Sequence, residues 1–160
     1  MIRHAGLVAA RLAGRWRGAL IEGPTASGKS DLALRALAIG MRLVADDRTE
    51  VFASGDRLFG KAPPALSGLL EVRGVGITRI PALKFSEIVL LVRCTDRDAI
   101  ERMPLFHEET VCGLELPVLS LWPFEASAPQ KMILALQHLG AGPHRGYQAA
   151  FATLERRVRL

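Results

Sequence analysis

The sequence has few cysteines, few aromatic residues and no long hydrophobic run, and each of these scarcities excludes a class of protein. No apolar stretch approaches the roughly 20 residues that a membrane-spanning helix needs, and the N-terminal residues lack the long uncharged core of a signal peptide. We therefore expect a cytoplasmic protein with no membrane partner. The two cysteines, Cys94 and Cys112, belong to no C-x-x-C pair or Cys/His cluster, which predicts buried thiols rather than a metal site or a disulfide.

The aromatic residues, 6% of the chain, are not interleaved with basic ones in the way that single-stranded nucleic acid binding requires. We therefore expect Trp16 and Trp122 to pack in the core or at its rim, and we expect no nucleic acid partner. The composition that remains, 160 residues with 49% hydrophobic and 23% charged side chains, predicts a single domain over residues 1–160. The net charge of +5 favours partners that carry phosphate or an acidic surface.

Glycine and proline divide the chain into short elements. A strand, a glycine loop, a helix and a second strand are predicted at 19–22, 23–28, 29–39 and 43–45. Further along, the sequence predicts a hairpin around 54–56, a strand at 88–92, a short helix at 95–103, a hairpin around Gly113, and a helix from Ser127 to about Leu139. The C-terminal tail predicts one more helix, basic, at 147–159.

The glycine loop fits the pattern G-x-x-x-x-G-K-[ST], in which each fixed position has a physical task. Its residues are Gly23, Pro24, Thr25, Ala26, Ser27, Gly28, Lys29 and Ser30. The glycines let successive N–H groups point at a phosphate, the lysine supplies a mobile cation, and the serine hydroxyl is a magnesium ligand. A strand before the loop and a helix after it are the context that this motif requires, so the sequence predicts a nucleotide site.

Two adjacent carboxylates, Asp46 and Asp47, follow the strand predicted after this helix. Because α/β sheets bind ligands at the carboxyl ends of their strands, we expect the pair to face the nucleotide. One carboxylate could hold magnesium and the other could accept a proton from an attacking hydroxyl. The alternative is that one aspartate caps a turn while the other pairs with Arg48 on the surface.

Three blocks, taken in order, resemble the HPr kinase/phosphorylase family. They are the loop Gly-Pro-Thr-Ala-Ser-Gly-Lys-Ser, then Arg-Leu-Val-Ala-Asp-Asp, then Leu-Leu-Glu-Val-Arg-Gly-Val-Gly-Ile from Leu69 to Ile77, the most specific of the three. The resemblance covers roughly residues 2–140 and is to the short members, which lack the separate N-terminal domain. It implies an α/β fold, a P-loop kinase core of the HPr kinase/PEP carboxykinase-like type, with a mixed sheet and flanking helices and hairpins.

The resemblance also implies a role for each site residue. It makes Gly23 to Ser30 the ATP loop, with Lys29 on the phosphates. Ser30 and Glu71 become Mg²⁺ ligands and Asp47 the proton acceptor, supported by Asp46. His4 becomes an active-site residue, and Arg73 lies in a segment needed for both directions of the reaction. From the residues alone, His4 would be an exposed or capping histidine, and Glu71 and Arg73, on one face of a predicted strand, a surface ion pair beside a tight bend.

The implied function is Mg-ATP-dependent phosphorylation of a serine on an HPr-like phosphocarrier, with inorganic phosphate attacking the phosphoserine in reverse, and a homo-oligomeric assembly, hexameric in the longer members. Those members carry an arginine in a proline-rich run where this chain has none, between Trp122 and Gln130. Arg93, Arg97 and Arg102 are the candidates to replace it. A sensor that binds ATP or phosphate without turnover, and a small-molecule P-loop kinase, are the alternative functions.

Overall fold

The computed structural model describes residues 1–140, so the predicted helix at 147–159 lies outside the described residues. Its strands are β1 (Ile2–Arg3), β2 (Ala5–Leu12), β3 (Arg15–Glu22), β4 (Arg42–Ala45), β5 (Thr49–Ser54), β6 (Arg57–Lys61), β7 (Leu69–Val72), β8 (Gly76–Arg79), β9 (Ser86–Cys94), β10 (Glu108–Val111) and β11 (Leu114–Leu121). The helices are α1 (Lys29–Ala38) and α2 (Ala128–Ala135), with a π-helical turn at Leu136–Gly140 and 3₁₀ turns at Pro64–Leu66 and Arg97–Ala99. No helix among residues 1–140 is long and apolar enough to span a membrane.

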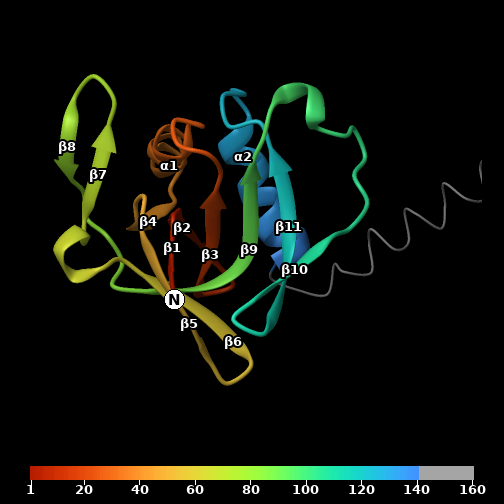
Figure 1. The fold of residues 1–160 in the computed structure, drawn as a ribbon, viewed down its shortest axis with the longest axis horizontal. Coiled ribbons are helices and arrows are strands. Elements are labelled where there is room, and N and C mark those ends of the chain that lie inside the picture. The colour runs from red at the N-terminus through yellow and green to blue at the C-terminus, as the bar shows by residue number, and fades with distance from the viewer. Residues whose placement is uncertain (141–160) are drawn as a thin grey trace, which may run out of the picture.

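The mixed sheet is continuous from β1 to β4 in the order β1-β5-β6-β9-β3-β2-β4. The second half of β9 also pairs in parallel with β11, while its first half pairs with β6. The predicted α/β fold with a mixed sheet, helices and hairpins is confirmed. In Figure 1, the hairpin of β7 and β8 stands apart from this sheet, at one side of the molecule beside α1.

Two apolar clusters cover the two faces of the sheet. Alternate residues of β2 and β3 divide between them: Val8 and Ile21 pack with α1 and α2, and Leu7 and Leu20 pack on the opposite face with the β5–β6 and β10–β11 hairpins. Because both faces are covered, the middle segments of the central strands are apolar without interruption, at residues 5–10, 19–21 and 88–92. Cys94 is buried in the helix-side cluster, as expected, whereas Cys112 is only half-buried; both are free thiols.

The strand β2 is the main element that the sequence did not predict. It pairs antiparallel with both β3 and β4, and a two-residue turn at Ala13 and Gly14, whose φ angles are 48° and 77°, joins it to β3. A turn with two positive φ values matches the twist of a tight hairpin. Since β2 separates them, β3 and β4 run in the same direction, and their carboxyl ends meet the amino end of β2 at one edge of the sheet.

The predicted helix at 95–103 is wrong, because only a 3₁₀ turn forms there at Arg97–Ala99. Met103 stays 52% exposed, so the segment does not pack an apolar face against the core, and a short helix without packing is marginal in water. The helix predicted from Ser127 is present but ends its α-helical part at Ala135. Trp16 and Trp122 are half-buried, as expected of rim residues.

Candidate functional site

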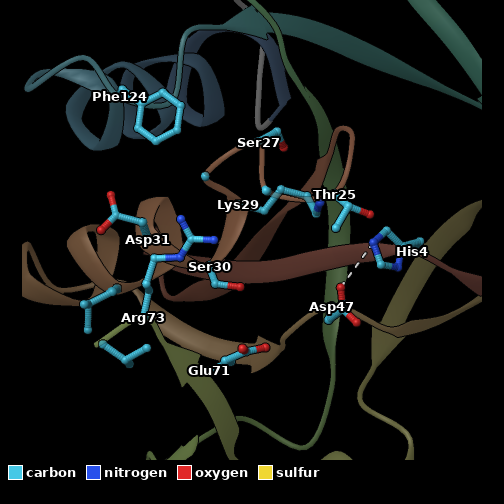
Figure 2. Close-up of a pocket in the computed structure, with 14 residues that line it drawn as sticks. His4, Thr25, Ser27, Lys29, Ser30, Asp31, Asp47, Glu71, Arg73 and Phe124 are labelled. Carbon is cyan, nitrogen blue, oxygen red and sulfur yellow. Dashed lines mark ion pairs between the residues drawn. The ribbon is translucent and has the colours of Figure 1, made fainter. Parts of the chain in front are cut away.

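The glycine loop joins β3 to α1 and forms one wall of a pocket of about 530 Å³ (Figure 2). Gly28, at φ 91°, turns the chain into the helix, and Lys29 begins it. The Lys29 side chain is buried, and its Nζ donates to the carbonyl oxygens of Gly23 at 3.0 Å and Pro24 at 2.8 Å. The ammonium group therefore lies against the loop backbone. Oxygen atoms of a bound phosphate would replace these carbonyl oxygens as its hydrogen-bond acceptors.

The acidic pair splits into a buried and an exposed carboxylate. Asp46, 8% exposed, accepts hydrogen bonds from Ser30 Oγ at 2.8 Å and from the Glu71 amide at 3.0 Å. Asp46 thus connects the end of β4 to the glycine loop on one side and to β7 on the other. Asp47 has a left-handed backbone, φ 61°, which turns its side chain into the pocket with 57% of it exposed.

The partner of the exposed carboxylate is His4. The His4 Nε2 atom lies 3.2 Å from Asp47 Oδ1, and both residues line the pocket (Figure 2). The antiparallel β2 explains the meeting, since it starts at Ala5 beside the carboxyl ends of β3 and β4. Among residues 1–140 the ion-pair partner of Asp47 is His4, and the predicted alternative pair with Arg48 is not formed.

Glu71 and Arg73 enter the pocket from the separate β7–β8 hairpin. Arg73 lies one residue beyond the end of β7, so the expectation that both residues alternate within one strand is wrong. No ion pair joins the two side chains within residues 1–140. Both are exposed to the pocket, where they face the loop from the opposite wall (Figure 2).

The oxygen atoms at this edge suit a hard divalent cation. The Ser30 hydroxyl and the Glu71 carboxylate both line the pocket, and oxygen ligands are those that Mg²⁺ prefers. Magnesium commonly takes only one or two protein ligands and completes its shell with water and phosphate oxygens. The lack of a cluster of three His, Cys, Asp or Glu side chains in the described part of the chain is compatible with such a sparse site.

A buried thiol lies directly behind the loop. A Cβ atom added at Gly23 would come within 2.8 Å of Cys94 Cβ, so the loop backbone rests on Cys94. Burial raises the pKa of the Cys94 thiol to about 11, against smaller opposing effects of the Lys29 charge and the Ser27 hydroxyl. At neutral pH the group is therefore a neutral thiol.

The three arginines considered as replacements for the family's missing one do not line the pocket. Arg93 pairs with Glu22 at 2.9 Å and also with Glu109, whose pKa it holds below the usual range. Arg97 lies over the Trp122 ring, with 5.5 Å from Cζ to the centroid. Arg73 is the arginine that does line the pocket.

Some pocket residues were not predicted from the sequence. Asp31 and Leu34 follow the motif on α1. Each lies three residues after another pocket residue, Asp31 after Gly28 and Leu34 after Asp31, so helical spacing could have placed both on the pocket face of the helix. Phe124 lies in the loop after β11, about a hundred residues from the motif, and no local sequence pattern indicates that it belongs to the site.

Comparison with known proteins identifies the family of this chain. The family model for the HPr Serine kinase C-terminal domain matches residues 15–121. The HPr kinase/phosphorylase of Exiguobacterium sp. is 36% identical over 116 residues, 65% of this chain and 37% of that protein, and that of Bordetella avium is 39% identical over 112 residues, 63% and 36%. The chain thus spans little more than a third of these relatives.

The fold has a solved counterpart as well. The HPr(Ser) kinase/phosphatase from Coxiella burnetii superposes with a TM-score of 0.73 at 22% identity, covering 86% of this chain and 94% of that structure. At this identity the likeness supports the fold, while the sequence match supplies the family. The family model covers well over half of the chain, and the chain therefore belongs to the HPr serine kinase C-terminal domain family.

Proposed function

We propose that this chain is a Mg-ATP-dependent kinase that phosphorylates a serine of an HPr-like phosphocarrier. The observation that carries the proposal is the His4–Asp47 pair, 3.2 Å apart, in the same pocket as Lys29 and Ser30. Phosphoryl transfer needs a proton acceptor beside a phosphate cradle. The names of the relatives, HPr kinase/phosphorylase, supply the substrate class.

In the proposed reaction, Asp47 takes the proton from the serine hydroxyl. The serine oxygen forms a bond to the γ-phosphorus, the bond from that phosphorus to the bridging oxygen breaks, and ADP leaves. Lys29 and the loop amides stabilise the charge that develops on the phosphate oxygens. His4 orients the Asp47 carboxylate toward the incoming hydroxyl.

Ser30 and Glu71 would hold Mg²⁺, with Asp46 fixing the Ser30 hydroxyl from behind. The bound ion would neutralise phosphate charge. Asp46 also accepts the Glu71 amide hydrogen bond, so it ties the two walls of the metal site together.

We extend the proposal to the reverse reaction, in which inorganic phosphate attacks the phosphorus of phosphoserine. The serine oxygen leaves, takes the proton from Asp47, and pyrophosphate is the second product. The supporting observation is Arg73, a cation on the pocket wall that could bind the attacking phosphate. Pyrophosphate release from the phosphorylated carrier tests it, and an Arg73→Ala variant should lose this reaction more than the forward one.

The decisive experiment incubates the protein with Mg-ATP and the phosphocarriers of its own cell, and reads intact masses. A gain of one phosphate on an HPr-like protein is the expected result. ATP binding without a gain of phosphate on any carrier would favour the alternative of a sensor that binds nucleotide without turnover. Phosphorylation of a metabolite instead would favour the small-molecule kinase. Against that alternative, this sequence has no obvious arginine-rich lid.

Three further properties belong to the proposal. The chain acts as one domain over residues 1–160, in the cytoplasm, as a homo-oligomer. For a hexamer, light scattering should give six times the chain mass of 17.4 kDa.

A further inference from the structure

The pocket has two chemically different ends. His4 and Asp47 lie at one end and Phe124 lies at the other, with the glycine loop between them (Figure 2). If the γ-phosphate meets Asp47, as the proposed function requires, the nucleoside must extend toward Phe124. Leu34 and Val72 add apolar surface to the pocket lining.

Phe124 is exposed but held in place. It is 57% exposed, and a Cβ atom added at Gly28 would come within 2.9 Å of its Cε1 and Cζ atoms, so the ring edge rests on the end of the loop. Trp122 supports it edge-on, with ring centroids 6.5 Å apart, and Arg97 stacks on Trp122 in turn. An aromatic ring fixed at a pocket edge with most of its surface uncovered is suited to stacking on a ligand.

The loop that carries Phe124 is fastened to α1. Arg35 donates to the carbonyl oxygens of Pro123 and of Glu125, the latter at 3.0 Å. The Glu125 amide in turn donates to the Trp122 carbonyl at 3.3 Å. The carbonyls on either side of Phe124 are thus already engaged, which leaves the ring rather than the neighbouring backbone to contact a ligand.

We infer that Phe124 is the stacking surface for the base of the nucleotide, with Arg35 as the positioning residue of its loop. This inference rests on the proposed function, because it takes the direction of the nucleotide from the position of Asp47. A ring reads the face of a base and not its hydrogen-bonding edge. ATP and GTP should therefore bind with similar affinity.

The test compares a ligand with a base and one without. Mg-ATP, Mg-GTP and Mg-tripolyphosphate are titrated by calorimetry into the wild type, Phe124→Leu and Phe85→Leu. Phe85, 59% exposed and not a pocket residue, is the matched control. Phe124→Leu should weaken both nucleotides roughly five- to hundredfold, the range of one base–aromatic stack, and leave tripolyphosphate unchanged, while Phe85→Leu alters none.

Two results would overturn the inference while leaving the kinase proposal intact. One is a Phe124→Leu variant that binds ATP as tightly as the wild type does. The other is an equal loss for ATP and tripolyphosphate, which would mean that Phe124 only shapes the loop. A wild type that binds neither ligand would overturn the kinase proposal itself. As a second readout, the fluorescence of Trp122 in a Trp16→Phe background, where it is the sole tryptophan, should respond to ATP and not to tripolyphosphate.

Discussion

Asp46 and Asp47 are chemically identical neighbours in different surroundings. Asp46 is buried and accepts two hydrogen bonds, whereas Asp47 is open to the pocket and contacts His4. A buried carboxylate with both oxygens bonded is a structural anchor, and an open one can exchange a proton with a ligand. The two residues should therefore respond differently to the same isosteric change.

Asp47→Asn should abolish phosphoryl transfer and leave nucleotide affinity within about twofold, since asparagine tolerates the left-handed backbone but cannot accept the proton. Asp46→Asn is the matched variant. Its amide group cannot accept from both Ser30 and the Glu71 amide, so Mg-ATP affinity should fall about tenfold, as for lost partners of metal ligands. Calorimetry and intact mass measure the two quantities. Loss of binding in Asp47→Asn would make Asp47 a ligand rather than the proton acceptor.

The Cys94 thiol should make stability depend on pH in the alkaline range. Its pKa is raised by burial to about 11 in the folded protein, while an unfolded cysteine ionises near 8.5. As the pH rises from about 8.5 toward 11, the thiol ionises in the unfolded state but not in the folded one. Ionisation lowers the free energy of the unfolded state, so the free energy of unfolding falls over this range. The gap in the free energy of unfolding between wild type and Cys94→Ala, measured in urea, should narrow over this range. A constant gap would contradict the assigned cause.

At the scale of elements, β2 decides which segments reach the site. It inserts between β3 and β4 and carries His4 to their carboxyl ends. The close fit of β3 in the sheet depends on Gly18, where an added Cβ would lie 2.7 Å from the Glu87 carbonyl oxygen and 2.9 Å from Leu7 Cδ1. A backbone carbonyl cannot move aside as a flexible side chain can.

Gly18→Ala should therefore lower the free energy of unfolding by about 1–3 kcal/mol, the range for overpacking a core. Gly6→Ala in β2 is the matched control, because its Cβ would meet only the Ala45 carbonyl oxygen at 3.7 Å, an ordinary contact. Chemical denaturation of both variants measures the difference. Equal stabilities would show that β3 and β9 can separate slightly without cost.

Elements defined by local signals were predictable. The strand–loop–helix unit around Lys29 and the two hairpins at 54–56 and 112–113 depend on glycine and on short-range periodicity, and they form where expected. The strand β2 was not predicted, because its run from Ala5 to Ala10 is buried on both faces and shows no alternation. Phe124 joins the site only through tertiary packing, which no local pattern encodes.

At the scale of the whole molecule, the site joins distant parts of the chain. Residues from before β2, the glycine loop, the end of β4, the β7–β8 hairpin and the loop after β11 all line one pocket. A ligand that contacts all of them is bound only by the folded chain. Binding must then stabilise the entire domain rather than one segment.

Mg-ATP at about one hundred times its dissociation constant should raise the free energy of unfolding by about 2.7 kcal/mol. Lys29→Ala should remove most of this gain at the same ATP concentration, whereas Lys61→Ala, which changes an exposed lysine paired with Glu50, should keep it. Thermal unfolding with and without nucleotide measures the shift. A full shift in Lys29→Ala would place the nucleotide elsewhere on the molecule.

The left-handed backbone at Asp47 has a consequence for how such a chain can evolve. At φ 61° glycine and asparagine are accommodated as readily as aspartate, and both residues have codons that differ from an aspartate codon by a single base. One mutation can therefore remove the proposed proton acceptor without straining the fold or altering the phosphate loop. An active phosphotransferase of this architecture is one step from a descendant that binds nucleotide and reports on it, so catalysis can be lost while the fold and its pocket are inherited.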